Sequence, residues 1–340
     1  MRKLTKLFYF GSIGIVVIFA AALFVSLRLF NQTETPSISH KKEKLIIGFS
    51  QIGTESAWRI QNTKSVFEAA KKKDIEILYD DAKQKQSNQL KAIRSFIVYQ
   101  VDVIVFVPIV ADGWDNVLQE AKEAGIPVLV IDRQINADPS LYAGFLGEDG
   151  FEQGKSAAKF LIGKCKESPE EKINILELAG TVNSSIAVAR AEGFRSIIKN
   201  DSRFNIIHTE DGDFLRSRGK EIMDKILAEN GDLKIGDNII DVIFSHNDPM
   251  TLGLLESLEE NNISPKEAII ISIDAEQESI DALKEGKLNC VVECNPNLGP
   301  TLMDLVQKVA NGETIPRTTY MQETVFTEND DFSTYKSRGY

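Results

Sequence analysis

The stretch VDVIVFVPIVADGWDNVLQEAKEAGIPVLVIDR, residues 101–133, contains one complete strand–helix–strand unit. The uninterrupted apolar run over 101–108 predicts a strand buried on both faces, because strands with one solvated face alternate apolar and polar residues. A helical segment follows over 114–125 and ends at Gly125, the residue type that most often terminates helices. Pro127 then starts a second apolar run, PVLVID. This order predicts a parallel sheet covered by helices.

The same alternation of strands and helices runs through most of the chain. Before this unit, strands are expected at 44–50 and 75–80. After a break near Gly147–Gly150 the alternation starts again, with strands expected at 173–178, 204–209, 239–245, 268–274 and 288–294. The chain has 340 residues, of which 43% are hydrophobic, and this suffices for two domains of ordinary size. We therefore predict an α/β fold of two doubly wound parallel-sheet lobes.

The N-terminal segment predicts a membrane anchor. Between Lys6 and Arg28 lie 21 uncharged residues, and a helix of that length spans roughly 30 Å, the thickness of a bilayer's hydrocarbon core. Basic residues precede this run, so the N-terminus is expected in the cytoplasm and the rest of the chain on the extracytoplasmic face of the cytoplasmic membrane. We assign 1–30 to a cytoplasmic tip and one transmembrane helix, and 31–44 to a flexible stalk. A cleaved signal peptide and a secreted form are the alternative.

Net charge and cysteine content exclude some function classes. The chain carries a formal net charge of −11, and an acidic body repels a phosphate backbone, so no nucleic acid is expected as a partner. The three cysteines are few and odd in number for a disulfide framework. Cys290 and Cys294 lie four strand residues apart, about 13 Å, which is too far for a disulfide. Free buried thiols are therefore expected.

The sequence also argues against an enzyme. It contains no H-E-x-x-H segment, no phosphate-binding Walker loop, no G-x-G-x-x-G and no recognisable order of nucleophile, base and acid. Only three histidines are present, and His246, at the end of a predicted strand, is expected to have a hydrogen-bonded structural role. No cofactor or metal ion is predicted. An enzyme that acts on sugars through paired acids such as Asp132 and Asp274 is a remote alternative.

Polar and aromatic side chains follow the predicted strands, at the edge where ligands of such sheets bind. They include planar donors and acceptors as well as flat apolar rings, and a neutral monosaccharide offers matching hydroxyls and C–H faces. Each has a structural alternative: Asp248 could cap a helix, Asp132 and Arg133 could pair locally, Trp114 could hold its helix to the sheet, and Arg190 could be solvated. The placement of the whole set, more than any member, indicates a sugar site.

Residues 45–330 resemble the periplasmic sugar-binding proteins of the ribose/galactose-binding cluster that serve ABC importers, and within it the galactofuranose-binding branch. The segments that carry this resemblance are GFSQIGTESAWR (48–59), AIRSF (92–96), VPIVADGW (107–114), VLVIDR (128–133), LAGTVNSSIAVARAEGF (178–194), GDFLRSRGKEIM (212–223), FSHNDPMTLG (244–253), SIDAEQESI (272–280) and VECNPNLGP (292–300). Val107-Pro108 stands where ribose-binding relatives have an asparagine, which argues against ribose.

The resemblance implies a type I fold whose lobes close on the sugar about a hinge of three crossing strands. It implies an N-terminal lobe of 45–147 plus 295–322 and a C-terminal lobe of 148–294 plus 323–340. The ligand contacts that it implies are Trp58, Arg59, Asp132, Arg133, Arg190, Phe214, Asn247, Asp274 and Glu293.

Two functions follow as hypotheses. The first is a membrane-tethered protein that binds a pentose or a galactofuranose-like sugar and delivers it to the permease of an ABC importer. The alternative is a sugar-sensing subunit that docks on the extracytoplasmic domain of a sensor histidine kinase in a two-component system.

Overall fold

The structure is a computed structural model that describes residues 44–340. These residues pack as one compact unit. The predicted anchor over 1–30, and the predicted stalk up to residue 43, lie outside the described residues. Within residues 44–340, none of the helices combines the length and the apolar character that a bilayer crossing requires.

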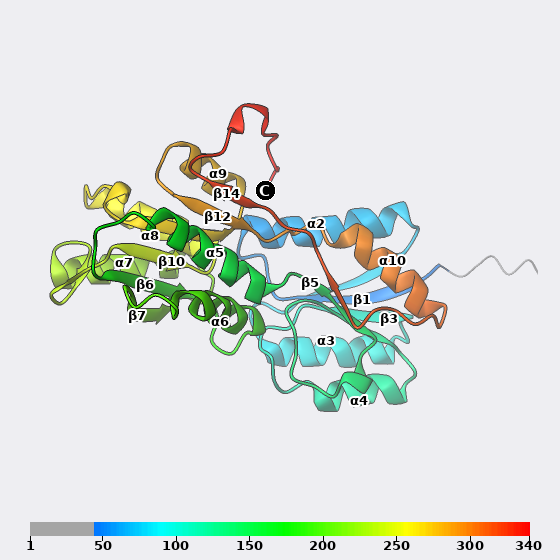
Figure 1. Cartoon of the computed structure of the whole chain (residues 1–340). Coiled ribbons are helices and arrows are strands. Elements are labelled where there is room, and N and C mark those ends of the chain that lie inside the picture. The colour runs from blue at the N-terminus through cyan, green and yellow to red at the C-terminus, as the bar shows by residue number, and fades with distance from the viewer. Residues whose placement is uncertain (1–43) are drawn as a thin grey trace, which may run out of the picture. The chain divides into compact units, whose positions relative to one another are not determined.

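The first sheet has six strands, all parallel, in the order β13-β5-β4-β3-β1-β2. One face packs against α2 and α10, and the other against α3 and α4, so the apolar strands are buried on both sides. Figure 1 shows α10 lying beside α2, although the two helices are far apart in the sequence. The bounds are β1 Ile46–Gln51, α2 Ala57–Lys72, β2 Glu76–Asp81, α3 Gln86–Val98, β3 Val103–Phe106, α4 Asp115–Glu123, β4 Val128–Asp132, β5 Gly144–Gly147, α10 Gly299–Ala310 and β13 Thr318–Tyr320.

The second sheet also has six strands, in the order β14-β12-β11-β10-β6-β7, and only β14 is antiparallel to its neighbour. Helices α5 and α6 cover one face, and α7, α8 and α9 cover the other. The bounds are α5 Gly150–Lys164, β6 Ile173–Ala179, α6 Ser185–Ile198, β7 Phe204–Asp211, α7 Arg216–Asn230, β10 Val242–Ser245, α8 Asp248–Glu260, β11 Ile269–Asp274, α9 Gln277–Lys284, β12 Cys290–Glu293 and β14 Val325–Thr327.

Short elements complete the described chain. A two-stranded ladder joins β8 (Lys234–Ile235) to β9 (Asn238–Ile239), and 3₁₀ turns span Pro139–Leu141, Pro265–Glu267 and Phe332–Thr334.

The predicted α/β class is confirmed, because the strands of the two six-stranded sheets are parallel apart from β14 and helices cover both faces of each of these sheets. The chain passes between the sheets three times: after β5, after β12 and between β13 and β14. The lobe boundaries implied by the resemblance stay a prediction, since residues 44–340 form one compact unit. Helix α5 was not expected from the sequence.

Two glycines let α5 and α6 approach closely. A Cβ atom on Gly154 would lie 2.0 Å from the carbonyl oxygen of Arg190, and one on Gly193 would lie 2.0 Å from that of Phe151. Real Cβ atoms never come so near to a backbone oxygen, so both positions require glycine. This contact fixes the part of α6 that carries Arg190.

Candidate functional site

A cavity, whose empty space including open solvent is about 380 Å³, lies where loops from the two sheets meet. The residues that line it are Glu55, Ser56, Trp58, Arg59, Asp132, Arg133, Ile186, Arg190, Phe214, Asn247, Asp274 and Cys294. They follow strands or begin helices at the carboxyl edges of both sheets, where ligands of open α/β sheets bind. Every residue of the predicted ligand set except Glu293 lines this cavity.

Arg59 and Asp132 form a buried ion pair on the wall from the first sheet. Nη1 of Arg59 lies 2.6 Å from Oδ2 of Asp132, and its Nε lies 3.3 Å from Glu55. Burial acts to lower the pKa of Arg59, but the two carboxylates outweigh burial and raise it. The second oxygen of Glu55 is buried without a hydrogen-bond partner, so this wall offers a ligand a free acceptor. Asp132 thus pairs with Arg59 of α2, and the expected alternative of a local pair with Arg133 is not seen.

Arg133 is the least satisfied cation of the cavity. Its guanidinium lies 5.1 Å from the centroid of the Phe214 ring, and its Nη1 donates to the carbonyl of Ile109 at 3.1 Å. Its Nε is buried without a partner. Burial, with Arg59 nearby, lowers the pKa of Arg133 to about 10, so the group stays charged at neutral pH. A buried charged donor without a partner is costly, and a ligand acceptor would relieve that cost.

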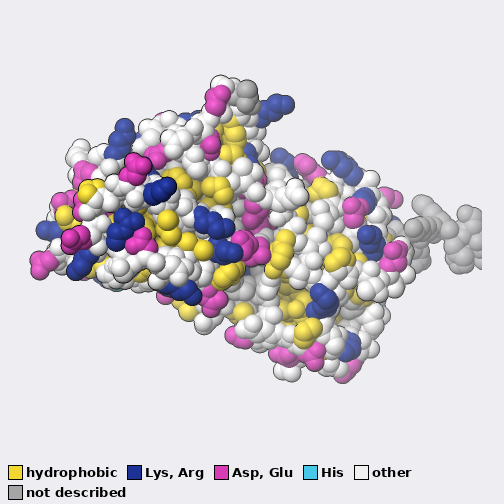
Figure 2. Space-filling view, in the orientation of Figure 1, with side chains coloured by type: hydrophobic (Ala, Val, Ile, Leu, Met, Phe, Trp, Pro, Cys, Tyr) yellow, Lys and Arg dark blue, Asp and Glu magenta, His cyan; other side chains and the backbone are white. Residues whose placement is uncertain are grey.

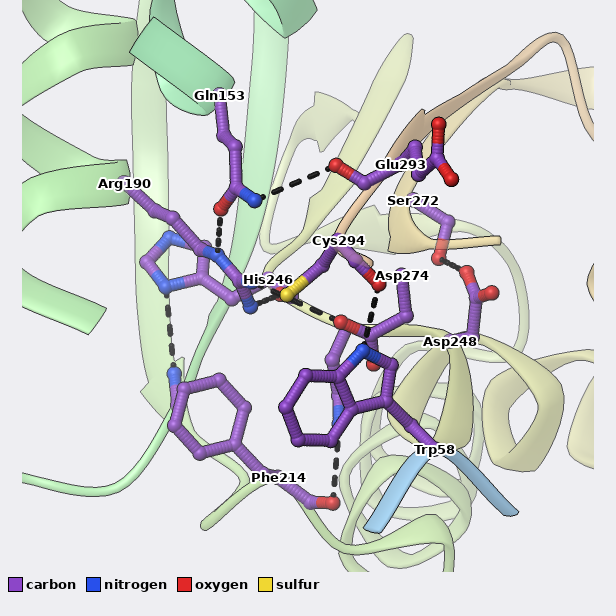
Figure 3. A network of polar contacts seen from close by, with 12 residues as sticks. Trp58, Gln153, Arg190, Phe214, His246, Asp248, Ser272, Asp274, Glu293 and Cys294 are labelled. Carbon is purple, nitrogen blue, oxygen red and sulfur yellow. Dashed lines mark hydrogen bonds and ion pairs between the residues drawn. The ribbon is translucent and has the colours of Figure 1, made fainter. Parts of the chain in front are cut away.

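Arg190 and Asp274 face each other on the opposite wall. Arg190 is 3% exposed, so it is not a solvated surface residue. Its Nε donates to Gln153 at 2.9 Å and its Nη1 to the carbonyl of His246, while Nη2 lies 3.6 Å from Asp274 (Figure 3). Burial raises the pKa of Asp274 to about 8, against the opposing effect of Arg190.

The backbone is strained at three cavity residues. Asp132, Phe214 and Asp274 have φ values of 64°, 60° and 138°, a region that L-residues rarely adopt. All three residues line the cavity, and such strain is concentrated at functional sites. The ring of Phe214 packs directly on Gly180, where an added Cβ atom would lie 2.0 Å from the ring. The ring position therefore depends on glycine at residue 180.

Trp58 and Asn247 are held by hydrogen bonds to backbone atoms. Nε1 of Trp58 donates to the carbonyl of Cys294 at 2.6 Å, and Figure 3 shows the indole reaching from α2 towards that carbonyl. Asn247 caps α8 through the amide of Met250, and its Nδ2 donates to the carbonyl of Phe214. Asp248 is therefore not the cap; it is the first residue of the helix.

Glu293 differs from the rest of the predicted set. Its carboxylate pairs with Arg338 and accepts a hydrogen bond from the amide of Thr324 at 2.8 Å. These bonds tie β12 to the C-terminal segment, and the predicted ligand contact of Glu293 stays a prediction. Trp114 is fully buried against Phe106, with ring centroids 4.8 Å apart, as expected of a helix-to-sheet contact.

Four lining residues were missed by the sequence analysis: Glu55, Ser56, Ile186 and Cys294. The spacing of Glu55 and Arg59, four residues apart, is a signal for a carboxylate that supports the arginine. Ile186 and Cys294 carry no such signal, because an apolar residue at the cavity looks like one in the core. The three cysteines are free and buried, as expected.

The environment of His246 is that of a structural residue. His246 is fully buried, and its Nε2 lies 3.1 Å from Glu177, which agrees with the expected structural role. Burial lowers the pKa of His246, against the effect of Glu177. Among residues 44–340, no group of three or more His, Cys, Asp or Glu side chains is arranged to hold a metal ion. Free donors and acceptors beside aromatic rings suit a neutral polyhydroxylated ring.

On the face drawn in Figure 2, basic and acidic side chains are interspersed, without a continuous basic surface of the kind that holds nucleic acid.

Comparison with known proteins decides the family. Residues 47–314 match the family model described as a periplasmic binding protein domain. The chain belongs to the periplasmic binding protein family. This confirms the resemblance seen in the sequence, and the two parallel sheets are the α/β type I fold of periplasmic binding proteins.

Three relatives are informative. The galactofuranose-binding protein YtfQ of Escherichia coli is 38% identical over 303 residues, which cover 87% of this chain and 93% of that protein. A Mycobacterium smegmatis structure in complex with β-D-fucofuranose has a TM-score of 0.79 and 40% identity, covering 84% of this chain and 91% of the other. The periplasmic binding component of the arabinose ABC transporter of Shewanella sp. ANA-3, bound to α- and β-L-arabinofuranose, has a TM-score of 0.77 and 35% identity, covering 83% and 92%. Each of these similar proteins either is named for a furanose or was solved with one bound.

Proposed function

We propose that this periplasmic binding protein captures a neutral monosaccharide in its furanose form and delivers it to an ABC importer. The observation that carries the proposal is the cavity between the sheets, whose walls keep Arg133 Nε and one Glu55 oxygen buried without partners. Hydroxyl groups both donate and accept, so one sugar can satisfy both atoms.

The furanose form is supported by the three relatives, each of which is at least 35% identical to this chain. A neutral ligand is supported by the charges of the cavity, because Asp132 and Glu55 already neutralise Arg59. An anionic sugar would meet these carboxylates at close range. The predicted tether over 1–30 would keep the protein beside a membrane partner.

The sensing alternative uses the same first step, closure on a sugar, and differs only in the partner that reads the closed form. Import is favoured here because one similar structure is the binding component of an ABC transporter.

A thermal-shift panel on the full chain tests the proposal. A sugar at 100 times its dissociation constant stabilises the folded state by about 2.7 kcal/mol, which raises the melting temperature by several degrees. We expect L-arabinose, D-fucose and a methyl galactofuranoside to raise it, and galacturonate to leave it unchanged. If no neutral sugar raises it, the proposal is wrong.

Substitution of Gly180 by alanine is expected to weaken sugar binding about tenfold. The new Cβ atom would occupy the place of the Phe214 ring, and the ring would have to leave its position beside Arg133. Isothermal titration with L-arabinose measures the change. Gly163→Ala is the matched control, because a Cβ atom there meets nothing within 4 Å. Equal affinities for the two variants would contradict the role given to Gly180.

Sugar affinity is expected to fall as pH rises from about 5 to about 8. Glu148 is 2% exposed, both of its carboxyl oxygens lack partners, and it follows β5 where the chain first crosses between the sheets. Burial, with Asp132 and Glu323 nearby, raises the pKa of Glu148 well above its usual range, and burial raises the pKa of Glu323 to about 8.

Both groups regain ordinary values near 4.3 when an open form exposes them to water. A raised pKa in the closed form means that closure takes up protons; this contribution is complete below the ordinary pKa and is lost as pH rises through the closed-form value. Titration in two buffers of different ionisation enthalpy measures the protons taken up at pH 7. Glu148→Gln should reduce the proton uptake on sugar binding and flatten the dependence of sugar affinity on pH. An unchanged pH dependence would contradict the assignment of this effect to Glu148.

A further inference from the structure

Glu276 accepts a hydrogen bond that joins the two halves of the molecule, one built on each six-stranded sheet. It lies between β11 and α9 on the second sheet and is 5% exposed. Its Oε1 accepts a hydrogen bond of 2.7 Å from the backbone amide of Trp58, which belongs to α2 on the first sheet. Glu276 is absent from the cavity lining, whereas Trp58 is part of it.

The carboxylate of Glu276 provides the acceptor that the first turn of α2 does not contain. The first turn of a helix leaves amide groups without intrahelical partners, and a carboxylate there is favoured by the helix dipole. Ser56 accepts from the amide of Arg59, but the first turn of α2 contains no acidic residue. The carboxylate from the other sheet takes the amide of Trp58 instead.

The backbone of Glu276 is bonded to Asp248 of the second sheet's helix α8. Its backbone amide donates to Oδ2 of Asp248 at 2.7 Å, and Oδ1 of the same carboxylate accepts from the hydroxyl of Ser272. Figure 3 shows the Asp248–Ser272 contact. Asp248 and Ser272 are fully buried members of the second sheet and its helix α8. The backbone of Glu276 is therefore anchored to the second sheet.

Trp58 also inserts its side chain into the second half. The indole is 4% exposed and packs in the apolar cluster that contains Cys294 and the α5–α6 face of the second sheet. Its Nε1 donates to the carbonyl of Cys294, and the guanidinium of Arg59 lies 4.6 Å from its ring centroid. One residue of α2 thus has both its backbone and its side chain bound by the opposite sheet.

We propose that Glu276 is a positioning residue for sugar binding, which holds the start of α2 and sets Trp58 in the cavity wall only while the two halves are closed. This inference rests on the proposed function. Because Glu276 and Trp58 belong to different sheets, opening must break their bond. Two further hydrogen bonds join loops of different sheets: the amide of Ala111 donates to the carbonyl of Asn183, and the amide of Gln134 donates to the hydroxyl of Ser185. Neither bond involves a carboxylate or a residue that lines the cavity.

The test measures sugar binding by the full chain with L-arabinose, the affinity by titration calorimetry and the dissociation rate by stopped-flow fluorescence. Glu276→Ala is expected to weaken binding about tenfold, mainly through faster dissociation, because the bond exists only in the closed form. Glu276→Gln should recover part of the loss, since its amide oxygen still accepts from the Trp58 amide. The melting temperature of the sugar-free protein should be the same for all variants.

The matched control is Glu278→Gln, two residues further along and paired with Arg216 on the surface. It should bind sugar like the unmodified protein. The inference is overturned if Glu276→Ala binds as tightly as the control, if glutamine recovers nothing, or if the melting temperature of the sugar-free variant falls, which would indicate a merely structural role. If the unmodified protein binds none of the sugars in the panel, the proposed function fails instead.

Discussion

Replacing Arg133 with alanine is expected to weaken furanose binding by about 100-fold or more. The guanidinium has one bond to the carbonyl of Ile109, stacks on Phe214 and keeps its buried Nε for a ligand. Hydrogen bonds to charged groups contribute about 1.5–3 kcal/mol each, and every 1.4 kcal/mol changes a dissociation constant tenfold. Loss of the stacking surface beside Phe214 adds to this effect. Calorimetric titration with L-arabinose measures it.

The control for Arg133→Ala is Arg94→Ala. Arg94 is an exposed arginine paired with Glu120 on the outside of the first sheet. Its removal should leave the affinity unchanged, since exposed ion pairs contribute little and this one is far from the cavity lining. Equal affinity of both variants and the unmodified protein would show that Arg133 does not bind the sugar.

Replacing Asp274 with alanine is expected to abolish measurable binding for a different reason. The carboxylate is an acceptor for sugar hydroxyls and also faces Arg190 at 3.6 Å. Its removal leaves the buried guanidinium of Arg190 without this neighbour and leaves the sugar without a hydrogen-bond partner. Asp274→Asn keeps the shape and one acceptor oxygen, so it should retain part of the affinity.

The two variants of Asp274 separate charge from shape. If alanine and asparagine lose affinity equally, the charge is what matters; if asparagine binds better, hydrogen-bond geometry contributes as well. Affinity unchanged in Asp274→Ala would contradict the assignment of this wall to the sugar.

The strand–helix alternation could be predicted because the central strands are apolar throughout. The predicted helix over 114–125 appears as Asp115–Glu123, and the strand over 101–108 as Val103–Phe106. Helix α5 was missed because its glycines weaken the helical pattern, yet those glycines are what allow α6 to lie against it. Strand β13 is short, polar and at a sheet edge, so its pairing with β5 depends on contacts that the sequence does not display.

The candidate site was predictable to the extent that strand ends define it. Residues such as Asp132 and Asp274 could be placed because they directly follow apolar strands. Pairing could not be predicted, since Asp132 binds Arg59 of another element and Glu293 binds Arg338, 45 residues away. The acceptor role of Glu276 depends on two sheets meeting, which no local pattern encodes.

Tryptophan fluorescence during a sugar titration tests the central claim most directly. The chain contains two tryptophans: Trp58 lines the cavity and donates hydrogen bonds to Glu276 and Cys294 of the opposite sheet, while Trp114 is buried against Phe106. We expect L-arabinose or D-fucose to produce a saturable change that persists in Trp114→Phe and disappears in Trp58→Phe. A titration in which no furanose-forming sugar changes the emission, or in which the change survives the loss of Trp58, would contradict the account.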